Sequence, residues 1–157
     1  ARAADSLDRS SNAHLDAVFG HSDLDFHVSH VALNTLLAES DIVVITCSLS
    51  PETRYLINKD ALAIMKSSAL LINSARGPIV DNNDLADALE NGKLFAAGLD
   101  VTDPEPIPPS HKLVSLPNCF ILPHLGSATL ETRNKMAAIA LINGISGLLG
   151  LELLHSV

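Results

Sequence analysis

Short apolar runs alternate along this chain with longer segments of helical periodicity, and this alternation constrains the fold most. Each run has apolar residues on both faces, as is typical of strands covered on both sides of a sheet. A segment long enough for a helix lies between consecutive runs, and such crossovers join parallel strands. The pattern therefore predicts an α/β fold with a parallel sheet and flanking helices. The predicted strands are residues 41–47, 69–73, 95–101 and 119–123.

Helical spacing predicts a helix before each of the first three strands. Asn58 and Asp81 stand where the N-caps of the second and third helices are expected, because their side chains can accept from the first free backbone amides. Gly92 follows the third helix, where a glycine commonly ends one. The predicted helices are residues 31–40, 59–67 and 82–91.

A loop follows the third predicted strand, and a long helix follows the fourth. Residues 102–112 contain four prolines, which predict a loop. A long helix should follow the last strand, with Ser127 or Thr129 as its N-cap. Its uncharged stretch, residues 136–151, is shorter than the roughly 20 residues of a membrane span. We therefore expect a helix buried in an interface.

Composition excludes several classes of function. The formal charge of −8 disfavours nucleic acid or an anionic membrane as a partner.

Cys47 and Cys119 lie in apolar runs without a C-x-x-C pattern, so we expect reduced, buried thiols in a cytoplasmic protein. The beginning of the chain has no apolar core of a secretory leader. His27 and His30 lack a third residue at ligand spacing, so we predict no metal site.

Three ionisable side chains follow directly after predicted strands. Arg76, Asp100 and His124 should meet at one edge, because the carboxyl ends of parallel strands share an edge of the sheet. Each by itself is more typical of a surface residue or a hydrogen-bonded core filler. With Glu105 from the proline loop they form a set: arginine binds carboxylates, histidine moves protons, and a carboxylate orients the histidine. The combination indicates reduction of a 2-oxo acid.

Three motifs carry a family resemblance. "INSARGPIVDNNDLADAL", "AAGLDVTDPEPIP" and "ILPHLGSAT" resemble the second half of the D-2-hydroxyacid dehydrogenase family, and within it most resemble glyoxylate/hydroxypyruvate reductases. The resemblance runs from Phe26 to the end of the chain. It implies that Arg76 holds the substrate carboxylate and carbonyl, that His124 protonates the ketone oxygen, and that Glu105 pairs with His124.

The resemblance also implies cofactor contacts. Asp100 would hydrogen-bond the nicotinamide carboxamide, and Ser48, the Ser74 backbone and Gly126 are similar to cofactor-contacting positions. Hydride chemistry belongs to the nicotinamide cofactor, NADP or NAD.

A dinucleotide-binding fold usually contains G-x-G-x-x-G, whose glycines admit the pyrophosphate to backbone amides. Gly20 is the only glycine before Gly77, so the chain has no such motif. We therefore expect a partial Rossmann-type, doubly wound sheet that lacks its first βαβ unit. Residues 1–25 are set apart as an N-terminal segment, and residues 26–157 as the C-terminal part of the cofactor domain.

Arg9 and Ser10 bear on the choice of cofactor. The segment around them resembles family positions that take the 2′-phosphate of NADP, although no apolar strand precedes them and a solvated loop is the alternative. If the similarity holds, NADP is preferred over NAD.

Two functions remain open at this point. The first is a fragment of an NAD(P)H-dependent reductase of small 2-oxo acids, homodimeric in the full-length family and not competent alone. The second is a catalytically silent, truncated relative that dimerises or binds partners through exposed apolar surface.

Overall fold

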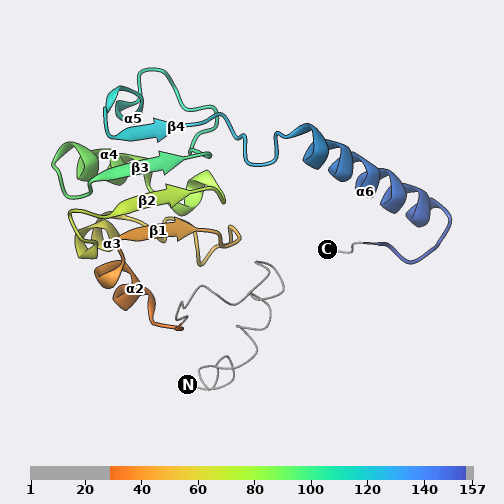
Figure 1. Cartoon of the computed structure of the whole chain (residues 1–157), viewed down its shortest axis with the longest axis horizontal. Helices are drawn as coiled ribbons and strands as arrows, with labels where there is room; N and C mark the ends of the chain where they lie inside the picture. The colour runs from red at the N-terminus through yellow and green to blue at the C-terminus, as the bar shows by residue number, and fades with distance from the viewer. Residues whose placement is uncertain (1–28, 155–157) are drawn as a thin grey trace, which may run out of the picture.

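A computed structural model describes residues 29–154 as a parallel four-stranded sheet with helices and one projecting helix (Figure 1). The strand order is β1-β2-β3-β4 and every neighbouring pair is parallel, which confirms the predicted α/β class. Each strand is shorter than the apolar run that predicted it. The strands are β1 (Ile42–Ile45), β2 (Leu70–Asn73), β3 (Ala96–Leu99) and β4 (Cys119–Ile121).

Three predicted helices form: the first is shorter than predicted at both ends, and the other two begin where predicted and end earlier. Asn58 accepts from the backbone amides of Asp60 and Ala61, and Asp81 caps the next helix in the same way, so both predicted N-caps are confirmed. Gly92 has a φ of 65°, a conformation that suits glycine after a helix. The helices are α2 (Leu33–Glu39), α3 (Lys59–Ile64) and α4 (Asn82–Glu90).

Two short elements were not predicted. A 3-10 turn, η1 (Gly77–Ile79), follows Arg76, and a one-turn helix, α5 (Lys112–Ser115), ends the proline loop. The His111 side chain accepts from the amide of Leu113 and caps α5. Both elements are single turns, too short for helical periodicity to reveal.

The core lies on one face of the sheet. Leu37, Leu62, Leu85 and Leu113, one from each of the helices α2 to α5, form a single buried cluster with inward side chains of the strands. No aromatic ring belongs to this cluster of Leu, Ile, Val, Ala and Met residues.

The opposite face of the sheet departs from prediction. Alternate β1 residues Ile42 and Val44 are 58% and 54% exposed, and Phe120 of β4 is 72% exposed. The prediction that the strands are covered on both faces is therefore wrong for the part of the chain that the structure describes. The strands are apolar on both faces, but the described helices cover only one.

Helix α6 (Leu130–Leu148) stands apart from the sheet. Thr129, one of the two predicted caps, accepts from the amide of Thr132. The helix extends away from the sheet (Figure 1), and none of its residues is buried against the described part of the chain, so its burial in an interface stays a prediction. No helix in this part of the chain combines the length and hydropathy that crossing a membrane requires.

The two cysteines have different surroundings, although both were predicted to be buried. Cys47 is exposed, because β1 ends at Ile45 and leaves the thiol beyond the sheet. Cys119 is half-buried, and its burial raises the pKa of the thiol to about 11. The prediction of a buried thiol is therefore wrong for Cys47.

We expect iodoacetamide at pH 8 to modify Cys47 and spare Cys119. The reactive form is the thiolate, and a pKa of about 11 leaves about one Cys119 thiol in a thousand ionised at that pH. Because the pKa is raised, the Cys119 rate should rise as pH approaches 11. Peptide mass spectrometry measures both rates, and Cys47→Ser is the control. Equal rates at the two thiols at pH 8 would contradict this assignment.

Candidate active site

Backbone hydrogen bonds join the carboxyl ends of β2, β3 and β4. The amide of Asp100 donates to the carbonyl of Asn73 over 2.9 Å, and the amide of His124 donates to the carbonyl of Asp100 over 3.0 Å. These bonds continue the parallel ladder beyond the strands. The segments that carry Arg76, Asp100 and His124 are therefore neighbours at one edge of the sheet, as their positions in the sequence predict.

His124 and Glu105 form an ion pair at this edge. Nδ1 of His124 lies 2.7 Å from Oε1 of Glu105, and the two side chains are 47% and 42% exposed. The pair joins the end of β4 to the proline loop. No other group among residues 29–154 bonds the ring of His124, so Nε2 is left to meet a ligand.

Asp100 braces the turn that carries His124. Its Oδ1 and Oδ2 accept from the backbone amides of Leu125 and Gly126 over 2.7 and 2.8 Å. His124 has a φ of 56°, in the left-handed region that non-glycine residues seldom occupy, and such a conformation costs about 1–3 kcal/mol. The two bonds to Asp100 help to hold this strained turn.

Arg76 follows β2 in an extended conformation and is exposed. One guanidinium nitrogen, Nη1, donates to the carbonyl of Ala75 over 2.7 Å. No carboxylate among residues 29–154 pairs with it, so most of its five donors are available to an anionic ligand.

Asn73 shapes the turn that presents Arg76, and sequence reasoning assigned it no role. Its side chain is 1% exposed; Nδ2 donates to the Arg76 carbonyl over 3.0 Å and Oδ1 accepts from the Ala75 amide over 3.1 Å. A buried amide at the end of an apolar strand was the signal available in the sequence, because buried polar groups need partners.

We expect Asn73→Ala to lower the free energy of unfolding by about 1–3 kcal/mol. The change removes two hydrogen bonds of a buried side chain and leaves the Ala75 amide without this partner, while the Arg76 carbonyl keeps its bond from the Ile79 amide. Urea denaturation measures the loss. Asn83→Ala, at an exposed position of α4, is the matched control and should stay within about 0.5 kcal/mol of the wild type. Equal losses in the two variants would contradict the bracing role.

A cavity of about 390 Å³ lies beside the ion pair. Asp100, Glu105 and His124 line it on the polar side, and Ile107 and Ile121 lie among its apolar lining. Its size suits a small organic molecule. Arg76 does not line this cavity, so the structure brings together Glu105, His124 and Asp100 and places Arg76 on a neighbouring segment.

The other residues predicted to contact the cofactor lie in different places. Ser48 lies beyond β1, where its carbonyl accepts from the Thr53 hydroxyl over 2.8 Å, and Ser74 is exposed beyond β2. Both are at the carboxyl edge of the sheet. Arg9 and Ser10 lie outside the described residues, as does His27. Residues 29–154 contain no group of three His, Cys, Asp or Glu side chains arranged to hold a metal.

The edge fits the nicotinamide end of a dinucleotide. A carboxylate has acceptor capacity beyond the two amides that Asp100 already binds, so it can take a further donor such as a carboxamide. Gly126 is tightly placed, since a Cβ there would lie 3.1 Å from Oδ2 of Asp100. A side chain at this position would crowd the Asp100 carboxylate.

Comparison with known proteins agrees with this geometry. The family described as "D-isomer specific 2-hydroxyacid dehydrogenase, NAD binding domain" matches residues 12–126, a range that begins inside segment 1–25 and ends before α6. The chain is 51% identical over 126 residues to a glyoxylate reductase/hydroxypyruvate reductase of Mus musculus, covering 80% of this chain and 38% of the mouse protein. The chain thus spans well under half the length of that relative.

Solved structures show the same fold. The TT0316 protein of Thermus thermophilus superposes with a TM-score of 0.79 at 43% identity, over 91% of this chain and 48% of that one. A D-isomer specific 2-hydroxyacid dehydrogenase of Xanthobacter autotrophicus Py2, solved with NADPH and MES, gives 0.69 at 38% identity, over 80% and 51%. The parallel sheet is thus of the Rossmann type expected from the sequence. The chain belongs to the D-isomer specific 2-hydroxyacid dehydrogenase family, a family of oxidoreductases, and contains residues of its NAD binding domain.

Proposed function

We propose that this chain carries the catalytic edge of an NAD(P)H-dependent reductase that converts small 2-oxo acids, such as glyoxylate or hydroxypyruvate, into 2-hydroxy acids. The observation that carries the proposal is the 2.7 Å pair of His124 and Glu105. A histidine oriented by a carboxylate is the usual device for proton transfer near neutral pH. The relationship to a reductase in Mus musculus supports the same reaction.

Each residue has a distinct role in this proposal. Arg76 binds the substrate carboxylate and orients the carbonyl, since its guanidinium has no carboxylate partner among residues 29–154. His124 donates a proton from Nε2 to the carbonyl oxygen. Glu105 accepts from Nδ1, which sets the ring orientation and stabilises the imidazolium. The reduced nicotinamide supplies the hydride when it is bound.

The cofactor would be held by the residues at the same edge. Asp100 accepts from the carboxamide, and Ser48, the Ser74 backbone and Gly126 lie along its path. We propose NADP as the preferred form, with Arg9 and Ser10 taking the 2′-phosphate, and the solved Xanthobacter relative with NADPH is consistent with that choice.

A nucleotide titration tests the proposal on the chain itself. We expect saturable quenching or enhancement of NADPH fluorescence, weaker with NADH, and little turnover of glyoxylate because the chain has no G-x-G-x-x-G motif. Binding that is equal for NADPH and NADH would contradict the role of Arg9 and Ser10. Absence of any binding would contradict the cofactor site.

An interaction module is the second candidate, and a specific observation favours it. Apolar side chains of α6 and of the open sheet face are exposed, among them Leu148 at 90%, Phe120 at 72% and Ile42 at 58%. Large exposed apolar patches commonly mark interfaces. Light scattering of the purified chain separates the two functions: assembly without nucleotide binding supports the module, and nucleotide binding supports the reductase.

A further inference from the structure

The proline loop that carries Glu105 is anchored two residues earlier, at Asp103. Oδ2 of Asp103 accepts from the hydroxyl of Tyr55 over 3.1 Å and lies 3.8 Å from Nη2 of Arg54. The backbone carbonyl of Asp103 accepts from Nδ2 of Asn82, a side chain that is 5% exposed, over 3.1 Å. The side chain and the main chain of Asp103 are thus held from two different segments.

Tyr55 is the centre of the side-chain anchor. Nη2 of Arg54 donates to its hydroxyl over 2.8 Å, and the guanidinium carbon lies 4.4 Å from the ring centroid, so Arg54 contacts both the hydroxyl and the face of the ring. The hydrogen bond to Asp103 raises the pKa of the Tyr55 hydroxyl further above the ordinary tyrosine value of about 10, so the protonated, donating form is the one present at neutral pH.

The backbone of Tyr55 reaches the segment that carries Arg76. Its amide donates to the carbonyl of Pro78 over 2.8 Å, and residues 57 and 80 form a parallel bridge directly afterwards. Tyr55 has a φ of 51°, a left-handed conformation that is strained for a bulky residue and that costs about 1–3 kcal/mol. One residue held in an unfavourable conformation thus connects both segments of the proposed active site.

Hydrogen bonds within residues 102–105 connect Asp103 to Glu105. The hydroxyl of Thr102 donates to the carbonyl of Pro104 over 2.9 Å, and its amide lies 3.4 Å from Oε2 of Glu105. Thr102 itself is 5% exposed. Because the four residues form one bonded unit, fixing Asp103 also fixes the carboxylate that meets His124.

We propose that Tyr55 and Asp103 are positioning residues that hold Glu105 in contact with Nδ1 of His124. The inference deepens the proposed function and rests on the same ion pair. Neither residue touches the reacting atoms; both act through Glu105. The prediction is that removal of the Tyr55 hydroxyl loosens the contact between Glu105 and His124 while the aromatic ring keeps its packing.

Nitrogen NMR of the histidine ring tests this on the full chain without any cofactor. The Nδ1 signal of His124, assigned by its disappearance in His124→Asn, reports the hydrogen bond to Glu105. Glu105→Ala defines complete loss of that bond. We expect Tyr55→Phe and Asp103→Ala each to shift the signal in the same direction as Glu105→Ala. The double variant should shift it no further than Asp103→Ala alone, because both substitutions remove the same hydrogen bond between Tyr55 and Asp103.

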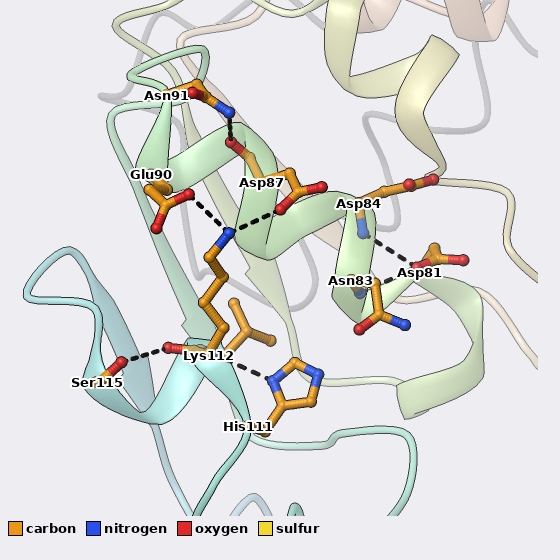
Figure 2. A network of polar contacts seen from close by, with 10 residues as sticks. Asp81, Asn83, Asp84, Asp87, Glu90, Asn91, His111, Lys112 and Ser115 are labelled. Carbon is orange, nitrogen blue, oxygen red and sulfur yellow. Dashed lines mark hydrogen bonds and ion pairs between the residues drawn. The ribbon is translucent and has the colours of Figure 1, made fainter.

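Lys112→Met is the matched control at the other end of the same loop. Figure 2 shows Nζ of Lys112 between Asp87 and Glu90 of α4. The distances from Nζ to Oδ1 of Asp87 and to Oε2 of Glu90 are 2.9 and 2.6 Å. Methionine keeps an unbranched side chain of nearly the same length but removes both ion pairs. This variant therefore disturbs an exposed polar network beside the loop without touching Asp103, and the His124 signal should not shift.

The outcomes distinguish failure of the positioning role from failure of the proposed function. If Glu105→Ala shifts the signal and neither Tyr55→Phe nor Asp103→Ala does, the positioning role is wrong and the proposed function stands. The role is also wrong if Lys112→Met shifts the signal as far as Tyr55→Phe, because any loosening of the loop would then suffice. If Glu105→Ala itself leaves the signal unchanged, the ion pair is absent in solution and the proposed function fails with it.

Discussion

We expect Gly77→Ala to be the most destabilising small substitution at the candidate site. A Cβ at this position would lie 1.9 Å from the carbonyl oxygen and 2.2 Å from the carbonyl carbon of Thr102. These are backbone atoms at the start of the loop that carries Glu105, so the overlap cannot be relieved by rotating a side chain. The loop and η1 must move apart, at a cost of about 3 kcal/mol or more. Urea denaturation measures the loss of stability.

Gly144→Ala supplies a control with the same added methyl group. Gly144 lies inside α6, where a Cβ would meet nothing within 4 Å. Alanine is the better helix former by about 1 kcal/mol, so this variant should be as stable as the wild type or slightly more stable. If Gly77→Ala unfolds at the same urea concentration as the wild type, Thr102 does not pack against Gly77 as described. The His124 ring signal should also shift in Gly77→Ala and remain unchanged in Gly144→Ala.

The largest expected effect on catalysis is that of His124→Asn. Because the chain covers 38% of the mouse reductase, the test replaces the matching 126 residues of that protein with those of this chain. We expect the chimera to oxidise NADPH with glyoxylate, and His124→Asn to lower kcat by about 10² to 10⁴, the usual contribution of a general acid. The absorbance of NADPH at steady state measures the rate.

His111→Asn is the matched control for that loss. His111 caps α5 through Nδ1 and does not line the cavity beside the ion pair. Asparagine is a good N-cap, so this variant should keep its fold and its rate within a small factor. If the His124→Asn chimera is as active as the His111→Asn chimera, the role of His124 as proton donor is wrong. Loss of activity through KM alone would point to binding instead of proton transfer.

Most of the fold was predictable because it is encoded locally. The apolar runs at 41–47 and 69–73 indicated buried strands, and Asn58 and Asp81 marked helix starts through hydrogen bonds that span only two or three residues. Which face of the sheet the helices cover was not predictable from such local patterns. The side chains of Ile42 and Val44 are as apolar as those of Val43 and Ile45, and only the position of the helices determines which pair is buried.

The candidate site was likewise predictable only in part. The sequence by itself determined which chemical groups stand after the strands, namely Arg76, Asp100 and His124, because strand ends and residue types are both local. Local sequence patterns did not determine their partners. The pairing of His124 with Glu105, over 19 residues, was expected from the family resemblance alone, and that of Asp103 with Tyr55, over 48 residues, came only from the tertiary structure. Such contacts depend on how separate segments pack, since periodicity and propensity carry no information about which side chains meet in space.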